Sequence, residues 1–449
     1  MSRETVSYVC SECGGHTLKW QGQCPSCGAW NTLVVGVSAP VKHSGYAAEI
    51  KGLRLADVEH AEVERASTGI AEFDRVLGGG LVTGSVVLIG GDPGIGKSTL
   101  LLQAAGGQPE GRSVLYVTGE ESLQQIAMRA KRLKVDVGNL NVLAETCVEH
   151  LIQVVNREPV NCVVVDSIQT MYSEEIASAP GSVTQLRESA SQLVRLAKTT
   201  GTTILLVGHV TKEGNIAGPR VLEHMVDAVL YFESESDSRF RILRAIKNRF
   251  GAANELGIFA MTETGMREVK NPSAIFLSRH PDPVAGSVVT VSREGSRPLL
   301  IEVQALADQS GAGSPRRLAL GLDQNRISML LATLNRHAGV SAYDHDVFLN
   351  VVGGVRISET SADLAALLAV VSSLRDKPVS QSTVVFGEVG LAGEIRPVSY
   401  GEERLREAVK RGFDYAVVPR ANMPKEAIKG IKLVGVDYLR GALEALELA

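Results

Sequence analysis

Short apolar segments alternate with segments of helical periodicity between about residues 56 and 270. Four of these segments are rich in β-branched residues and apolar at successive positions: VVLIG, VLYVTGE, CVVVDS and TTILLVGHV. Strands that are apolar on both faces are typical of a parallel sheet covered by helices on either side. The pattern therefore predicts an α/β domain with a parallel sheet over residues 56–270.

A second α/β pattern occupies residues 285–449. The strand candidates LLIEVQALAD, RRLALGLD and DVFLNVVGGVRI come first, and a helix is predicted over 361–375. The first 30 residues have no helical period and are rich in cysteine, glycine and tryptophan, and residues 31–55 read as a linker. We thus expect a small module at 1–30, a linker at 31–55 and two α/β domains.

The composition is that of an ordinary globular protein. The chain has 449 residues, of which 44% are hydrophobic and 21% charged, with a formal net charge of −4. The amino terminus lacks the basic and apolar regions of a signal peptide, and no apolar run approaches the roughly 18 residues that cross a bilayer. We expect a cytoplasmic protein without a membrane partner.

Four of the six cysteines lie close together, as CSEC and CPSC, with ten residues between the two motifs. In a cytosolic chain such pairs indicate a metal site, and a tetrahedral Zn²⁺ takes four thiolates. Because about 30 residues bury too little apolar surface to fold unaided, we predict a structural zinc finger. Its ligands are Cys10, Cys13, Cys24 and Cys27. Cys147 and Cys162 are interpreted as buried packing residues and His16 as a surface residue.

The segment GDPGIGKST lies between the apolar strand at 86–90 and an apolar helix at 99–105. It matches G-x-x-x-x-G-K-[ST], in which glycines let backbone N–H groups close on phosphates. We expect Lys97 to contact the β- and γ-phosphates of ATP and Ser98 to bind Mg²⁺. The predicted nucleotide-binding residues of this loop are Gly91, Asp92, Pro93, Gly94, Ile95, Gly96, Lys97, Ser98 and Thr99.

Acidic residues end two further strands at the same predicted edge of the sheet. Asp166 ends CVVVD, where it would hold the Mg²⁺ through water; an ordinary strand-end aspartate is the alternative. Glu120 and Glu121 follow VLYVTG. Because adjacent side chains point in different directions, one glutamate is expected to activate the attacking water and the other to cap the next helix.

The residues STGIAEFDRVLGGGLVTGSVVLIGGDPGIGKST are similar to the core of RecA-type recombinases, and the whole chain resembles the RadA family, also called Sms. The resemblance implies a four-cysteine zinc finger, a RecA-like P-loop ATPase domain and a carboxyl-terminal Lon-protease-like α/β domain of the ribosomal S5 domain 2-like type. It gives Glu120 the position of the catalytic glutamate. It gives His209, which ends TTILLVGH, the position that senses the γ-phosphate; a satisfied strand-end histidine is the alternative.

The same resemblance implies an activity on DNA. It implies a ring-forming, DNA-dependent ATPase that moves the branches of recombination intermediates during DNA repair, as a homo-hexamer. Its partners would be single-stranded and branched DNA and the RecA recombinase. The loops after Asp166 and His209 would face the axis of the ring, with Lys212, Arg220 and Arg187 as weak candidates for contacts with DNA phosphates. Solvated loop charges are the alternative.

A run of five cations without an acidic residue, SRFRILRAIKNRF, ends in the segment KNRFG. KNRFG resembles the K-x-R-x-G segment of DnaB-type hexameric helicases, where a lysine and an arginine of one subunit reach the nucleotide of the next. The resemblance implies that Lys247 and Arg249 take part in catalysis at the neighbour's site. A finger acting on the nucleotide of its own chain and a contact with DNA phosphates are the alternatives.

In the last domain the resemblance to Lon aligns Ser361 with the Lon nucleophile. A Ser–Lys dyad needs a lysine that can lose its proton, but the corresponding stretch SYGEERLREA offers Arg404, which stays protonated. Thr360-x-x-Asp363 reads as a capping box at the start of the 361–375 helix. We predict no protease activity but a role in oligomerisation and a DNA surface with Arg316, Arg317 and Arg326 as weak candidates. An ATP-regulated peptidase or protein-remodelling machine is the alternative function.

Overall fold

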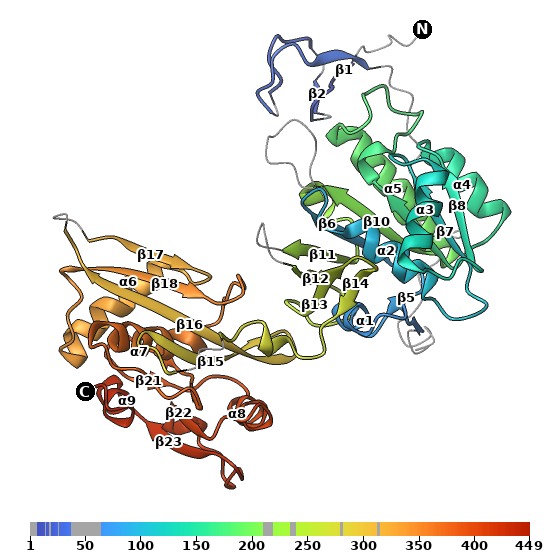
Figure 1. The fold of residues 1–449 in the computed structure, drawn as a ribbon. Helices are drawn as coiled ribbons and strands as arrows, with labels where there is room; N and C mark the ends of the chain where they lie inside the picture. Colours follow the sequence, from blue (N-terminus) through green and yellow to red (C-terminus); the bar gives the residue numbers. More distant parts are fainter. Residues whose placement is uncertain are drawn as a thin grey trace, which may run out of the picture. The chain divides into compact units, whose positions relative to one another are not determined.

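The chain forms two compact units, Met1–Val269 and Lys270–Ala449 (Figure 1). The computed structural model describes residues 7–13, 15–17, 19–25, 27–36, 64–209, 219–233, 239–278, 282–311 and 315–449. The second unit begins at Lys270, so it includes residue 270, which the sequence assigned to the ATPase domain, and residues 271–284, which the sequence left outside both domains. Among the helices of these ranges, none has the length and apolar character needed to cross a membrane.

The amino-terminal module is a three-stranded antiparallel sheet in the order β2-β1-β3. Its strands are β1 (Ser7–Cys10), β2 (His16–Thr17) and β3 (Leu33–Gly36). Because β3 pairs along the full length of β1, the module includes residues that the sequence assigned to the linker. The rest of the predicted linker, 37–55, and the side chain of His16 lie outside the described residues.

A nine-stranded sheet forms the centre of the ATPase-like region, in the order β14-β13-β12-β11-β6-β10-β9-β7-β8. The six strands from β11 to β8 in this order are parallel, as predicted. Strands β12 to β14 are antiparallel additions that the sequence analysis missed. The strands are β6 (Val86–Gly91), β7 (Val114–Thr118), β8 (Leu140–Ala144), β9 (Cys162–Asp166), β10 (Thr203–His209), β11 (Ala228–Glu233), β12 (Phe240–Asn248), β13 (Leu256–Thr262) and β14 (Gly265–Glu268).

Helices cover both faces of this sheet, so alternate residues of its central strands enter different cores. Tyr116 of β7 faces a core that includes Leu101 of α2, and its neighbour Val117 faces one that includes Leu193 of α5. Cys147 and Cys162 are fully buried, which confirms their interpretation. The helices are α1 (Ala71–Leu77), α2 (Lys97–Gly106), α3 (Leu123–Leu133), α4 (Val148–Arg157) and α5 (Val183–Thr200), and the short strands β4 (Arg65–Ala66) and β5 (Leu81–Val82) pair with each other.

The Lys270–Ala449 unit contains a seven-stranded sheet in the order β17-β18-β16-β15-β19-β22-β23. Helix α7 (Asp363–Leu374) corresponds to the predicted 361–375 helix and is buried along most of its length. The sheet strands are β15 (Ser287–Glu294), β16 (Arg297–Gln309), β17 (Arg317–Leu320), β18 (His345–Val351), β19 (Thr383–Val385), β22 (Tyr415–Pro419) and β23 (Lys432–Val436). The remaining elements are the pair β20 (Glu388–Val389) and β21 (Ile395–Arg396) and helices α6 (Gln324–Thr333), α8 (Gly401–Lys410) and α9 (Leu439–Ala445).

Candidate functional site

The predicted phosphate loop connects β6 to α2. Gly91, Gly94 and Gly96 have φ values of 149°, 76° and 117°, which residues with a Cβ rarely adopt. A Cβ added at Gly94 would meet no atom within 4 Å, so this part of the loop is open to a ligand. Helix α2 begins at Lys97, and its first N–H groups have no partner in the helix itself. The loop therefore fits an anion such as a triphosphate.

Lys97 supplies a buried positive charge to this loop. The residue is only 2% exposed, and its Nζ donates hydrogen bonds of 2.9 Å to the carbonyl oxygens of Gly91 and Asp92. Burial lowers the pKa of Lys97 to about 8, against the opposing effect of nearby carboxylates such as Asp166. An ammonium group desolvated in this way gains strongly from a phosphate partner.

The ends of three neighbouring strands bring the predicted acidic residues together with His209. Asp166, at the end of β9, accepts a 2.5 Å hydrogen bond from the hydroxyl of Tyr116. Glu120 accepts a 2.6 Å hydrogen bond from the hydroxyl of Ser167, and its Oε1 lies 3.4 Å from Nε2 of His209. The sequence analysis missed Tyr116 and Ser167, although a tyrosine inside an apolar strand is a signal that its hydroxyl needs a partner.

The two adjacent glutamates have different surroundings. Glu121 forms an ion pair with Arg129 of α3, whereas Glu120 faces Ser167 and His209. Helix α3 is capped by Ser122, whose side chain accepts from the N–H of Gln125 and whose N–H donates to the side chain of Gln125. The expectation that one glutamate caps this helix is therefore wrong, because a capping box already satisfies the helix start. This geometry favours Glu120 as the glutamate that faces the nucleotide.

The ring of His209 lies beside Glu120, but the contact lacks the geometry of a hydrogen bond. Among the described residues neither ring nitrogen makes a hydrogen bond, which does not fit a satisfied strand-end histidine. Burial and the charge of Lys97 lower the pKa of His209, so its imidazole is neutral near pH 7. Its carbonyl oxygen accepts a 3.1 Å hydrogen bond from Nε2 of Gln169, which follows β9. The ends of β9 and β10 are therefore linked next to the phosphate loop.

The cations of the 239–249 run lie toward opposite ends of strand β12 and make different contacts there. Arg241 donates a 3.1 Å hydrogen bond to the carbonyl of Ile95 in the phosphate loop. At the other end of β12, Nζ of Lys247 donates 2.8 Å hydrogen bonds to the carbonyls of Glu223 and Val226. Arg249 lies 3.1 Å from Oδ1 of Asp227, with 56% of its side chain exposed. The run is not a single basic patch because an extended strand carries its ends apart.

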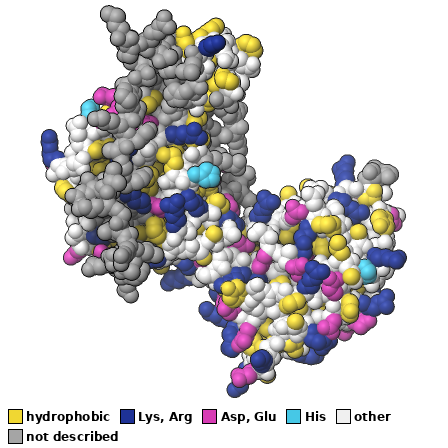
Figure 2. All heavy atoms as spheres, turned by 180° about the vertical axis from the view of Figure 1, so that it is seen from behind, with side chains coloured by type: hydrophobic (Ala, Val, Ile, Leu, Met, Phe, Trp, Pro, Cys, Tyr) yellow, Lys and Arg dark blue, Asp and Glu magenta, His cyan; other side chains and the backbone are white. Residues whose placement is uncertain are grey.

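The candidate DNA-binding residues are only partly described. Lys212 and the side chain of Arg220 lie outside the described residues, and Arg187 is exposed on α5. In the second unit Arg316 is exposed, but Arg317 donates to the carbonyl of Ala342 and Arg326 pairs with Asp363. On the face of this unit drawn in Figure 2, basic and acidic side chains are interspersed. That face offers no separate basic surface.

The four clustered cysteines meet at one point of the amino-terminal module. The Sγ atoms of Cys10 and Cys27 are 3.7 Å apart, those of Cys13 and Cys24 are 3.6 Å apart, and all four lie within 4.8 Å of one another. Thiolates about 2.3 Å from a tetrahedral Zn²⁺ lie about 3.8 Å from each other. The cluster therefore fits a structural zinc site, because four thiolates fill all four tetrahedral coordination positions and leave none for a substrate.

The position aligned with the Lon dyad contains a buried ion pair. Arg404 is 1% exposed and donates to both carboxylate oxygens of Glu359, at 2.8 and 2.7 Å. The hydroxyl of Ser361, also buried, donates to Glu359 at 2.5 Å. Burial alone raises the pKa of Glu359, but the hydrogen bonds and charge of Arg404 outweigh it and the pKa is lowered. A carboxylate stabilised in this way is a poor base for the serine.

The predicted capping box at the start of α7 is wrong. The hydroxyl of Thr360 donates to Glu388 at 2.6 Å, and the carboxylate of Asp363 accepts from Arg326 and from the N–H of Val389. Helix α7 has Ala362 at its N-cap and no side-chain cap. Charged partners that are distant in sequence have replaced the local hydrogen bonds.

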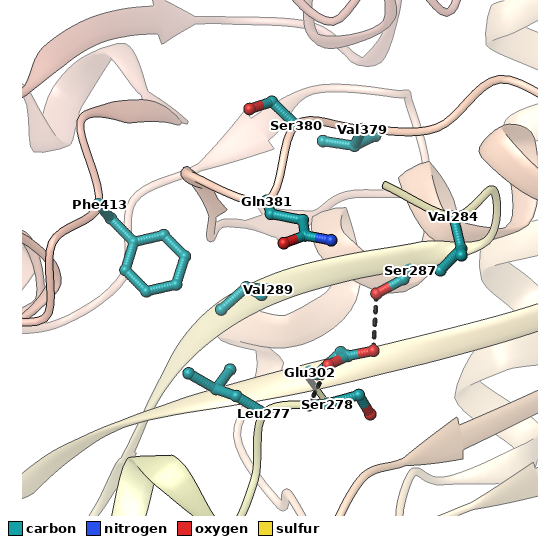
Figure 3. Close-up of a pocket in the computed structure, with 10 residues that line it drawn as sticks. All are labelled: Leu277, Ser278, Val284, Ser287, Val289, Glu302, Val379, Ser380, Gln381 and Phe413. Atoms are coloured by element: carbon teal, nitrogen blue, oxygen red, sulfur yellow. Dashed lines mark hydrogen bonds between the residues drawn. The ribbon is translucent and has the colours of Figure 1, made fainter. Parts of the chain in front are cut away.

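A separate pocket lies in the second unit between β15, β16 and the segment before β19 (Figure 3). Its buried acid, Glu302, accepts hydrogen bonds from the hydroxyl of Ser287 at 2.7 Å and the N–H of Ser278 at 2.6 Å. Gln304 donates a further hydrogen bond of 2.9 Å. Because these donors satisfy the carboxylate, we interpret Glu302 as a residue that fixes the 276–278 segment to the sheet.

Comparison with known proteins agrees with this architecture. Residues 8–34 match the family model described as rubredoxin metal binding domain, residues 53–215 the AAA domain and residues 320–422 the subunit ChlI of Mg-chelatase. These matches confirm the predicted fold class, a P-loop ATPase domain between an amino-terminal zinc ribbon and a Lon-like carboxyl-terminal domain. An AAA ATPase domain identifies an ATP-hydrolysing enzyme.

Curated relatives match over nearly the whole chain. DNA repair protein RadA of Pseudomonas aeruginosa is 58% identical, with 99% of this chain and 100% of that protein covered. The proteins of the same name from Escherichia coli (strain K12) and Bacillus subtilis (strain 168) are 55% and 48% identical, with 98% and 99% of both chains covered. The chain belongs to the RadA family of DNA repair proteins.

Proposed function

We propose that the protein is a DNA-dependent ATPase of recombinational repair that assembles as a homo-hexameric ring and moves the branches of recombination intermediates. Its partners in this role are single-stranded and branched DNA and the RecA recombinase, in the cytoplasm. The relatives are named as DNA repair proteins, which supports a DNA partner. The nucleotide site supports ATP as the energy source.

One observation carries the link between ATP and DNA. Glu120 contacts Ser167 and lies beside His209. Ser167 and His209 each stand at the start of a loop that we expect to face DNA. Gln169, in the first of these loops, also donates to the carbonyl of His209. A change at the γ-phosphate that moves Glu120 would therefore reach both loops through direct contacts.

The roles of the site residues follow from their positions. The loop from Gly91 to Thr99 would hold the phosphates of ATP, with Lys97 on the β- and γ-oxygens. Ser98 and Asp166 would hold Mg²⁺, which neutralises charge on these oxygens when bound. Glu120 would take a proton from the attacking water, and His209 would sense the γ-phosphate. In the amino-terminal module, Zn²⁺ on the four cysteines would stabilise the fold.

The experiment is the ATP hydrolysis rate against added single-stranded DNA, repeated over a salt series. We expect stimulation that weakens as salt rises, because contacts to DNA phosphates release counterions. An unfolded protein serves as the competing activator. Stimulation by the unfolded protein and none by DNA would favour the protein-remodelling alternative and refute this proposal.

We further propose that Lys247 and Arg249 act on the nucleotide of a neighbouring subunit. The backbone of Arg249 pairs with Asp227, which pairs with Val86 at the start of β6. The phosphate loop begins five residues later, at Gly91, which is about 16 Å further along the strand. An arginine side chain does not span that distance, so this geometry speaks against action on the same chain's nucleotide.

Mixed rings test this second proposal. Arg249→Ala subunits keep an intact phosphate loop, and Lys97→Ala subunits keep an intact Lys247 and Arg249 pair. In a mixed ring, the intact loop of one subunit can therefore meet the intact pair of its neighbour. We expect both variants to be inactive alone and hydrolysis to return on mixing. If Arg249→Ala instead keeps its DNA-independent hydrolysis and loses DNA affinity with a smaller salt slope, the pair contacts DNA.

A further inference from the structure

Tyr116 places a polar group in a fully buried part of the ATPase sheet. It is 0% exposed, in the middle of β7, and the other residues of this strand are valine, leucine and threonine. A phenylalanine would fill the same space without a hydroxyl that needs a partner. The hydroxyl therefore calls for an explanation beyond packing.

The partner of this hydroxyl is the proposed Mg²⁺-site carboxylate. In the register of β7 and β9, Asp166 lies opposite Thr118, two residues beyond Tyr116 on the same face of the sheet. The phenol reaches forward along this face and donates to Oδ2 of Asp166 at 2.5 Å. This is the face covered by α2, the helix that begins with Lys97 and Ser98.

The phenol is the donor in this hydrogen bond, because a carboxylate oxygen accepts. Burial and the charge of Asp166 raise the pKa of Tyr116 above its ordinary value. Tyr116 thus contacts Asp166, one of the groups that would hold the metal.

We propose that Tyr116 is a positioning residue for the Mg²⁺ of bound Mg–ATP. Its hydroxyl holds Oδ2 of Asp166, so that Oδ1 is the oxygen that would face the Mg²⁺. Partners of this kind fix the orientation of a metal-binding group before the metal arrives. The inference rests on the proposed Mg–ATP site and adds a residue that does not itself touch the nucleotide.

The test is Tyr116→Phe, which removes the hydroxyl and keeps the ring. Binding of a fluorescent ATP analogue is measured in EDTA and over a Mg²⁺ titration, and hydrolysis is measured over the same titration. We expect wild-type affinity in EDTA and a Mg²⁺ midpoint raised about tenfold, with hydrolysis restored at high Mg²⁺. Tyr415→Phe is the matched control, because Tyr415 donates to the carbonyl of Ala445 in the other unit.

A double-mutant cycle with Asp166→Asn separates positioning from packing. Because the hydroxyl would act only through Asp166, adding Tyr116→Phe to Asp166→Asn should not change the Mg²⁺ midpoint further. An unshifted midpoint in Tyr116→Phe, or a uniform loss of activity at every Mg²⁺ concentration, would overturn the inference alone. A wild-type protein whose ATP binding ignores Mg²⁺ would overturn the proposed site as well.

Discussion

Replacing Arg404 with alanine should destabilise the Lys270–Ala449 unit strongly. The guanidinium donates to both oxygens of Glu359 and to the carbonyls of Val291 and Ser399. Its removal leaves a largely buried carboxylate with Ser361 and the N–H of Arg293 as its remaining donors. Breaking a buried ion pair costs about 3–5 kcal/mol, and the lower end applies because 27% of the Glu359 side chain is exposed.

Thermal unfolding measures this loss. For a unit of about 180 residues, roughly 3 kcal/mol lowers the melting temperature by about 6–12 °C. Arg406→Ala is the matched control on the same helix, because Arg406 is an exposed residue that pairs with Glu402 four positions away. That pair is worth only about 0.3–0.5 kcal/mol. If both variants melt at the same temperature, the buried pair does not stabilise the fold as argued.

The same pair predicts a pH dependence. The pKa of Glu359 is below its ordinary value of 4.5 in the folded protein, so its stabilising effect is present above pH 4.5 and lost as the pH falls through the folded-state pKa. In Arg404→Ala, burial without compensation should raise the pKa of Glu359. The difference in melting temperature between variant and wild type should therefore start to narrow above pH 4.5, where the variant's carboxylate takes up a proton, and continue to narrow below pH 4.5 as the wild type loses its ion pair. A difference in melting temperature that does not change with pH would contradict the conclusion that Glu359 causes the loss of stability.

Three further changes test the other sites. The pKa of Lys97 is about 8, and contact with phosphate raises it. ATP binding should therefore take up a proton, and its affinity should fall as the pH rises above 8. Calorimetry in two buffers of different ionisation enthalpy measures the proton uptake. Cys27→Ser should lose about one equivalent of zinc by metal analysis and leave ATP hydrolysis intact; a metal content unchanged from wild type would contradict the four-sulfur site. Ser361→Ala should cost about 1 kcal/mol in thermal unfolding, through its lost hydrogen bond to Glu359, and leave hydrolysis unchanged. Loss of a peptidase activity in that variant would overturn the structural role.

Local motifs in the sequence determined the parts of this protein whose residues are neighbours in the chain. The phosphate loop needs glycines, a lysine and a helix start within nine positions, so GDPGIGKST contains the whole phosphate-binding motif. The paired CxxC motifs likewise bring four thiols together within a small module. The parallel strands could be read from their continuous apolar runs because both faces of the sheet are covered.

Only the tertiary structure decided how distant residues meet. The strand order β10-β9-β7 brings Glu120, Asp166 and His209 together, and the register of β7 and β9 gives the hydroxyl of Tyr116 its partner. The antiparallel direction of β12 carries Lys247 away from the phosphate loop of its own chain. At the start of α7, charged partners from elsewhere in the fold replaced the capping box. Sequence spacing does not specify these contacts, because each depends on which strands lie side by side.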